Sequence, residues 1–122
     1  MEHLEHYEPS LIEQKCTPHE DAVAPLSSGE LDRFMRLLKG GWQVAYGHHL
    51  YRRYTFQDFR KALDFALRVG DLAEEEGHYP NLTVSFGRVE IALFAQAIDG
   101  LSKNDFILAA KISRLNLEDS RV

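Results

Sequence analysis

The segment Glu74-Glu75-Glu76-Gly77-His78-Tyr79-Pro80 holds the residues best suited to acid–base chemistry. The imidazole of His78 can give or take a proton near neutral pH. Glu74 precedes it by one helical turn and could orient the ring. Pro80 restricts Tyr79 to extended backbone conformations, which determines how these side chains project. The same residues also suit a solvated helix end, so spacing alone leaves both readings open.

Other reactive side chains are less well placed. His48-His49 would need a third ligand to hold a metal, and the surrounding sequence supplies none. Cys16 has no neighbouring base, which is typical of a structural or surface thiol. Arg52 and Arg53 are neighbours on a predicted strand and face opposite sides, so they cannot form one basic patch. We therefore expect no metal site and no nucleic-acid partner.

The chain has 122 residues, the length of one ordinary domain. Hydrophobic residues make up 44% and charged residues 27%, which is typical of a soluble globular protein. No apolar run reaches the length of a membrane span, and the N-terminus lacks the basic-then-apolar order of a signal peptide. A single cysteine favours a reducing compartment. We expect a cytoplasmic protein with no membrane partner.

The formal net charge of −5 belongs to the N-terminal part of the chain. Residues 1–26 hold six acidic side chains and one lysine, whereas residues 27–122 hold 13 of each sign. Three of the four prolines also lie in the N-terminal part. Residues 1–25 are therefore predicted to form an extended or loosely docked acidic arm, with only Leu11 and Ile12 as anchors. The folded domain is predicted over residues 26–122.

Within the predicted domain, helical and strand patterns alternate. Capping residues precede helical apolar spacing, and two alternating segments flank each glycine-containing turn. The expected elements, in chain order, span residues 28–39 (helix), 42–46 and 49–56 (strands), 59–76 (helix), 82–86 and 88–94 (strands) and 103–115 (helix). The order αββαββα predicts an α+β fold with a four-stranded antiparallel sheet covered by helices on one face.

The central predicted helix carries one continuous apolar face. Its members are Phe59, Ala62, Leu63, Ala66, Val69, Gly70 and Ala73. Gly70 is expected to allow close packing against the sheet. Because a four-stranded sheet has two edges that invite pairing with a second copy, we also expect a homodimer, with a tetramer as the other possibility.

Taken together, five segments resemble the pterin-4a-carbinolamine dehydratase family. They are Gly41-Trp42-Gln43-Val44, Phe56-Gln57-Asp58-Phe59, Glu74 to Pro80, Gly87-Arg88-Val89 and Gly100 to Phe106. The match spans about residues 26–115 with essentially no gaps. The resemblance implies the αββαββα fold and an enzyme class that dehydrates 4a-hydroxytetrahydropterin without metal or organic cofactor. Histidines in the family's cleft move the protons that this lyase reaction requires.

The family motif can be carried over position by position. The matching positions are Glu74 (the acid), His78 (the first histidine), Pro80, Phe86 (the aromatic residue) and Asp105. The departures are Tyr79 at the second histidine, Gln96 at the strand histidine, and Phe94 and Ala95 just before it. A phenol that ionises only in strong base and an amide that does not titrate cannot replace two imidazoles near pH 7.

Loss of two of three histidines on a retained scaffold is the pattern of a pseudoenzyme. It resembles the non-catalytic branch found with α-carboxysome genes, the pterin-dehydratase-like RuBisCO assembly factors. That resemblance implies a chaperone-like protein of carbon fixation, in the cytoplasm with the carboxysome, that contacts RuBisCO subunits through Tyr79, Phe94 and the acidic arm. The alternative is a working dehydratase that binds a pterin and uses His78 and Glu74. A transcription-factor dimerisation cofactor, like some animal members, is the third reading.

Overall fold

The computed structural model describes residues 10–17 and 24–120, with side chains up to residue 116. The elements, in chain order, are η1 (Leu11–Glu13), α2 (Ser28–Leu37), β1 (Gln43–Ala45), β2 (His49–Thr55), α3 (Phe59–Glu76), β3 (Asn81–Ser85), β4 (Arg88–Leu93), η3 (Gln96–Ile98) and α4 (Lys103–Ser120). Apart from the short turns η1 and η3, this is the αββαββα order predicted from the sequence. The fold class is confirmed as α+β.

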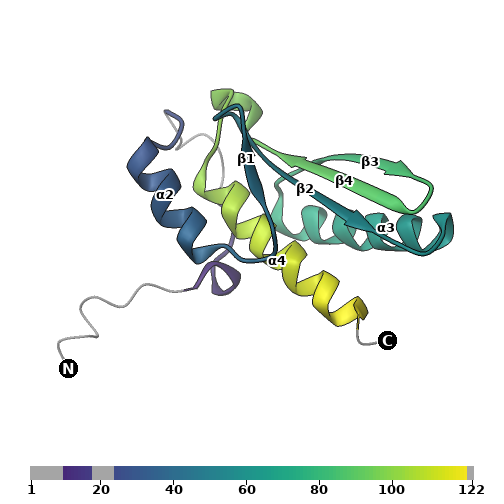
Figure 1. Ribbon diagram of the computed structural model, residues 1–122. Coiled ribbons are helices and arrows are strands. Elements are labelled where there is room, and N and C mark those ends of the chain that lie inside the picture. The colour runs from purple at the N-terminus through teal and green to yellow at the C-terminus, as the bar shows by residue number, and fades with distance from the viewer. Residues whose placement is uncertain (1–9, 18–23, 121–122) are drawn as a thin grey trace.

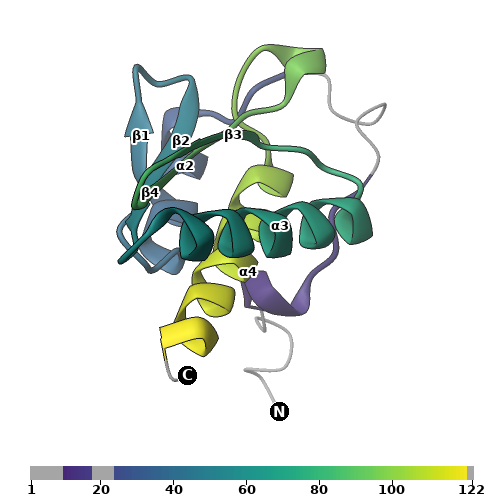
Figure 2. The ribbon, with the colours of Figure 1, turned by 90° about the vertical axis from the view of Figure 1, so that its right-hand side faces the viewer.

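The four strands form one antiparallel sheet in the order β1-β2-β4-β3, so the two predicted hairpins join through β2 and β4. Leu50 of β2 lies opposite Leu93 of β4, and Asn81 of β3 lies opposite Ala92. Helices α3 and α4 cover one face of the sheet, while α2 packs on α4 (Figures 1 and 2). The helix-covered face holds the core, and β1 and β3 form the two edges.

The β1–β2 turn lies one residue earlier than the sequence suggested. Tyr46 and Gly47 both have positive φ angles, 55° and 66°, and the amide of His48 donates to the carbonyl of Ala45. Positive φ at both central residues is the geometry of the tight turn that matches the twist of a hairpin. Tyr46 therefore belongs to the turn and not to the strand.

Helix α3 is capped at both ends by residues suited to that role. The carboxylate of Asp58 accepts from the amide of Lys61 at 2.8 Å, and Gly77 ends the helix in the left-handed conformation with φ of 69°. Both features satisfy backbone groups that a helix end leaves unpaired. The helix thus delivers the chain directly to His78.

The apolar face predicted for α3 is wrong in part. The buried side chains of α3 are Ala62, Phe65, Val69 and Ala73. Phe59 and Leu63, which were expected on this face, are exposed, as is Leu67. A Cβ atom added to Gly70 would meet nothing within 4 Å, so this glycine does not permit close packing against the sheet. Helix α3 therefore has a second apolar stripe that points away from the core.

Helix α4 supplies the largest share of the core. Its fully buried apolar residues are Phe106, Ile107, Leu108, Ala109 and Ile112. The ring of Phe106 packs on Phe34 of α2 with the ring centroids 5.4 Å apart.

Within residues 10–17 and 24–120, no helix is both long enough and apolar enough to cross a bilayer.

The segment 10–17, which holds the two predicted anchors of the N-terminal arm, packs on the domain. Leu11 is a core residue, while Ile12 stays exposed. The amide of Cys16 donates to Glu76 at 2.9 Å, and Thr17 exchanges two hydrogen bonds with the side chain of Asn104. Ser10–Thr17 is therefore part of the folded body, and the other residues of the predicted arm before Ala24 lie outside the described residues.

Candidate functional site

The end of α3, the start of β3, the end of β4 and the start of α4 come together at the end of the sheet opposite the β3–β4 turn (Figure 1). The antiparallel pairing of Asn81 with Ala92 brings the start of β3 beside the end of β4. After Gly77 reverses the chain, the amide of His78 still donates to the carbonyl of Ala73. This arrangement carries His78 from the end of α3 towards the start of α4.

The imidazole of His78 is a buried group paired with Asp105. Its Nε2 atom lies 2.5 Å from Oδ1 of Asp105. The side chains of His78 and Asp105 are 2% and 0% exposed. A buried carboxylate needs such a partner because desolvation of an unpaired charge costs several kcal/mol. The structure therefore joins two of the residues that the family motif singled out, through a contact that solvent does not reach.

The second oxygen of Asp105 organises the start of α4. Its Oδ2 atom accepts from the amide of Ser102 at 2.8 Å and from the Ser102 hydroxyl at 3.1 Å. The spacing of three residues is that of a capping box, in which an acid in the first turn bonds back to the residue before the helix. Asp105 thus couples the first turn of α4 to His78.

The acids that precede His78 do not act on it in the way the spacing suggested. The side chain of Glu74 is exposed, and the carboxylate bonded to His78 is that of Asp105. The buried acid of this group is Glu76, whose oxygens receive the Lys111 ammonium at 2.7 Å and the amide of Cys16 at 2.9 Å. Glu76 therefore holds the segment 10–17 against α3 and α4.

The electrostatic environment of Glu76 follows from these contacts. Burial raises its pKa, but the hydrogen bonds from Lys111 and from the Cys16 amide, together with the charges of Lys111 and Lys15, outweigh burial and lower the pKa. The pKa of the nearby Cys16 thiol is raised to about 12, first by burial and then by the negative charge of Glu76. Neither role was foreseen from the sequence, because the partners are far apart along the chain.

Of the four predicted departures from the family motif, the two at histidine positions face solvent. Tyr79 is 59% exposed, and Gln96 in η3 is exposed as well. Pro80 and Phe94 are half-buried, while Ala95 is buried and pairs with Gly100 in an isolated bridge. The solvent-accessible part of the predicted cleft thus presents a phenol and an amide.

Phe86 does not join this group. It lies in the turn between β3 and β4, at the far end of the hairpin from Tyr79, and is 77% exposed. Five residues of extended strand separate Phe86 from the start of β3, a distance of about 17 Å at 3.3–3.4 Å per residue. Within one chain, the structure therefore separates Phe86 from the other predicted site residues.

His48 and His49, which the sequence suggested only as an incomplete pair of metal ligands, lie beside the candidate site. The ring of His48 lies 4.7 Å from the ring of Phe94, centroid to centroid, and its Nε2 atom is 2.8 Å from Oδ1 of Asp99. The Nδ1 atoms of His48 and His49 are 3.2 Å apart. Burial lowers the pKa of His49, and the neighbouring His48 acts in the same direction. Their position follows from the β2–β4 pairing, which the sequence did not reveal.

The histidines at this end do not assemble a metal centre in the part of the chain that is described. No group of three or more histidine, cysteine, aspartate or glutamate side chains there is arranged to hold a metal ion. What the arrangement offers is one buried imidazole–carboxylate pair and an exposed surface containing Tyr79 and Gln96.

Comparison with known proteins agrees with this fold. The family model described as pterin 4 alpha carbinolamine dehydratase matches residues 24–115. Relatives whose names mark them as candidate pterin-4-alpha-carbinolamine dehydratases include one from Rubrobacter xylanophilus, 49% identical over 86% of this chain and 97% of the relative. Another, from Rickettsia canadensis, is 47% identical over 84% of this chain and 94% of the relative.

Two solved structures share the architecture. One is a transcriptional coactivator/pterin dehydratase from Brucella melitensis, with a TM-score of 0.68 and 27% identity over 75% of this chain and 97% of that one. The other is a pterin dehydratase-like protein described as a RuBisCO assembly factor in the α-carboxysome, with a TM-score of 0.51 and 24% identity over 63% of this chain and 88% of that one. The second likeness concerns the fold alone. On the match to residues 24–115 and the identity to its relatives, this chain belongs to the pterin-4a-carbinolamine dehydratase family.

Proposed function

We propose that this protein is a non-catalytic member of its family that works by binding another protein, and that its partner is the RuBisCO of the α-carboxysome. The observation that carries the proposal is which side chains occupy the positions of the family motif and how exposed they are. Their one imidazole, that of His78, is buried against Asp105, while the solvent-facing positions hold Tyr79 and Gln96.

The chemistry of dehydration explains why this matters. A hydroxyl leaves as water only when a nearby acid protonates it, and a base must take the proton from the ring nitrogen. Groups that exchange protons near pH 7 must also reach the substrate. At the exposed positions, the phenol of Tyr79 and the amide of Gln96 can supply neither the acid nor the base near pH 7.

The exposed aromatic surface supports a binding role. Tyr79 presents a large amphipathic side chain to solvent, and aromatic residues of this kind contribute strongly to protein interfaces. RuBisCO is the partner to test first because one structure with this fold is described as its assembly factor. Under this proposal the protein works in the cytoplasm, in association with carboxysomes.

Co-expression with the subunits of an α-carboxysomal RuBisCO tests the proposal. The yield of assembled, soluble holoenzyme is expected to rise several-fold with the wild-type protein. Tyr79→Ala should reduce that gain, whereas Tyr46→Ala, which removes an even more exposed tyrosine from the β1–β2 turn, should not. An unchanged yield with the wild-type protein would refute the assembly role.

A working dehydratase is the second candidate. It is favoured by the names of the relatives and by the retained His78–Asp105 pair. A stopped-flow assay with 4a-hydroxytetrahydropterin distinguishes the two functions. We expect the background rate from the wild-type protein and a gain from the double variant Tyr79→His/Gln96→His, since one acid–base group contributes about 10²–10⁴ in rate. Turnover by the wild-type protein that Glu74→Gln abolishes would establish the dehydratase instead.

The proposal includes a homodimer. The second apolar stripe of α3 supports it, because Phe59, Leu63 and Leu67 recur every fourth residue on the exposed side, and Leu67 is 68% exposed. Such a stripe on a soluble domain favours a covering partner. Open space at Gly70 leaves room for a side chain from a second copy.

The charges beside this stripe suit an antiparallel pair. Arg60 and Lys61 lie near the start of α3, while Asp71, Glu74 and Glu75 lie near its end. If two copies pair about Leu67, Leu63 of each lies near Gly70 of the other, and Arg60 lies near Glu74. Opposite charges then face each other twice, as a two-fold axis requires.

Light scattering coupled to size exclusion tests the dimer. The wild-type protein should elute with twice the mass of one chain, and Leu67→Glu should shift it to the monomer. Leu37→Glu provides the control, because it places the same charge on an exposed leucine of α2. A monomeric wild-type protein would refute the dimer without affecting the assembly proposal.

A further inference from the structure

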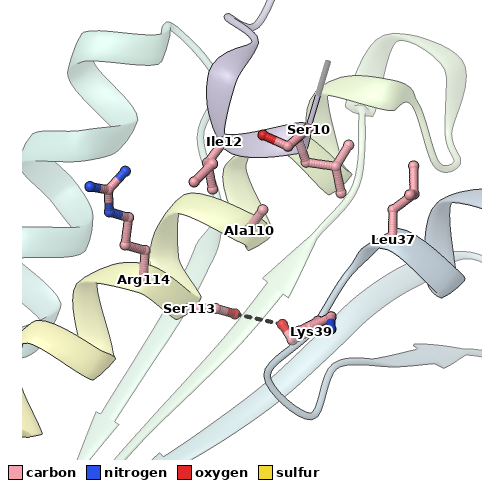
Figure 3. Close-up of a pocket in the computed structure, with 8 residues that line it drawn as sticks. Ser10, Ile12, Leu37, Lys39, Ala110, Ser113 and Arg114 are labelled. Carbon is pink, nitrogen blue, oxygen red and sulfur yellow. Dashed lines mark hydrogen bonds between the residues drawn. The ribbon is translucent and has the colours of Figure 1, made fainter. Parts of the chain in front are cut away.

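Three adjoining cavities extend from the side of α4 near α2 to strands β1 and β2. The first, of about 310 Å³, lies between η1, the end of α2 and α4 (Figure 3). It shares Lys39 and Ser113 with a second cavity of about 340 Å³. The second shares Gly41 and Arg52 with a third of about 350 Å³ at the start of β1. We call the three together the α4 trough; none of the predicted site residues lines it.

The first part of the trough has apolar walls. Ile12 of η1 and Leu37 of α2 lie on either side of Ala110 of α4, as Figure 3 shows. Both larger side chains are exposed, so they retain apolar surface that a ligand can cover. The hydrogen bond of 3.0 Å from the Ser113 hydroxyl to the Lys39 carbonyl fixes the wall between the first and second cavities (Figure 3).

Among the residues that the structure describes, the charged side chains that line the trough are all cationic. Lys39 and Arg114 stand at the first cavity, and no acidic residue of the described ranges lines any of the three. Arg52 and Arg53 both line the third cavity, so the expectation that these two side chains cannot share one surface is wrong. Arg52 is held in place, since it donates to the carbonyls of Gly40 and Arg53. Positive residues with no acid among them favour a negatively charged ligand over a neutral or basic one.

Tyr54 lines the second cavity, and its hydroxyl is buried. Tyr54 is 4% exposed, and its hydroxyl makes no hydrogen bond within the described structure. The Arg52 guanidinium lies 4.2 Å above its ring. Burial raises the pKa of Tyr54. The polar side chains of Ser113 and Arg52, which lie near the hydroxyl without a hydrogen bond of ordinary geometry, lower the pKa by less, so the hydroxyl keeps its proton and remains a donor. A buried donor left unpaired destabilises the free protein, and an acceptor from a ligand would remove that cost.

We infer that the α4 trough binds an acidic segment of a partner protein, in which apolar side chains alternate with carboxylates. The apolar side chains would cover Ile12 and Leu37, the carboxylates would meet the cations, and a carboxylate or carbonyl oxygen would accept from Tyr54. This inference rests on the proposed protein-binding function and adds the partner's chemistry. A nucleic acid fits less well, because its bases and phosphates do not suit the apolar first cavity.

Fluorescence anisotropy with a labelled peptide of alternating leucine and glutamate provides the test. The full-length protein should bind this probe, and binding should weaken as salt is raised. A leucine–lysine peptide and a serine–glutamate peptide should bind more weakly, because each lacks one half of the complementary chemistry. Equal binding of all three peptides would refute the inference.

Variants locate the site. Lys39→Glu and Arg114→Glu should each weaken Kd about tenfold, which corresponds to about 1.4 kcal/mol. Tyr54→Phe should also weaken Kd but should not lower the melting temperature, because it removes an unpaired hydroxyl and keeps the ring. Lys103→Glu at the exposed start of α4, outside the trough, is the matched charge control. If Lys103→Glu weakens binding as much as the trough variants, the assignment is wrong.

Two further outcomes separate this inference from the proposed function. If Lys39→Glu loses the peptide but still raises RuBisCO assembly, the trough is not the functional surface, although the assembly role stands. If the wild-type protein binds the peptide through the trough but does not assist RuBisCO, the trough stands and the named partner is wrong. Tighter peptide binding after deletion of residues 1–9 would assign the trough to the chain's own acidic segment and refute a partner as its occupant.

Discussion

The Nε2 atom of His78 lies 2.5 Å from Oδ1 of Asp105, with both side chains buried where the end of α3 meets the start of α4. Because Oδ2 of Asp105 also accepts from Ser102, the pair joins the helix start to the segment that leads into β3. At the position where the family places its first histidine, this chain thus has a structural tie that solvent does not reach.

Asp105→Asn tests this tie. The amide keeps the shape of the carboxylate but cannot accept from both His78 and Ser102, so one buried group loses its partner. The free energy of unfolding, measured in urea, should fall by about 1–3 kcal/mol. Asp64→Asn, on the exposed side of α3, should change it by less than about 0.5 kcal/mol. Equal effects would show that the buried pair adds no stability.

Glu76 should make stability depend on pH in the acid range. Its pKa is below the ordinary value of 4.5 in the folded protein, so the unfolded chain binds more protons as the pH falls. Its contribution is therefore complete above pH 4.5 and is lost as the pH drops through the folded pKa. Glu76→Gln should lower the melting temperature at pH 7, and the gap to wild type should narrow below pH 4.5. Glu75→Gln, at an exposed side chain, should show neither effect.

The Cys16 thiol should react slowly. With a pKa of about 12 against the ordinary 9.0, it forms about 10³-fold less thiolate than a free cysteine at the same pH. The rate with a disulfide reagent at pH 8 should rise by orders of magnitude on unfolding in urea. Glu76→Gln should raise it in the folded protein, since it removes a negative charge and a contact. A folded-state rate equal to the unfolded rate would contradict this burial.

Truncation should distinguish two parts of the N-terminal region. Deletion of residues 1–9 should leave the melting temperature unchanged, whereas deletion of residues 1–25 should lower it, because Leu11 and the contacts of Cys16 and Thr17 are lost. Leu11→Ala alone should cost about 2–5 kcal/mol, as for other buried leucines. An equally stable protein after the longer deletion would restore the loose-arm interpretation.

Local signals predicted most of the fold. The Ser27–Glu30 capping box forms as expected, with Glu30 donating its amide to Ser27 at 3.2 Å, and Asp58 and Gly77 bound α3. These features depend on groups three or four residues apart, so the sequence displays them directly. The outward stripe of α3 was misassigned, because apolar spacing does not say which of two adjacent faces meets the core.

The candidate site was only half predictable. Resemblance to the family singled out His78 and Asp105, but not that they bond to each other across 27 residues. It also grouped Phe86 with Tyr79, which one chain places at opposite ends of a hairpin. A family motif identifies residues along the sequence, but the distances between these residues depend on how the helices and strands pack.

By itself, the sequence determined the elements and their order, and its resemblance to the family predicted that Tyr79 and Gln96 replace two histidines. Only the tertiary structure decided that His78 is buried, that His48 lies beside Phe94, and that Glu76 holds a segment 60 residues earlier in the chain. The physical reason is that caps, turns and strand alternation arise from neighbouring residues. A buried contact between distant residues arises only when the sheet pairing and the helix packing have brought their elements together.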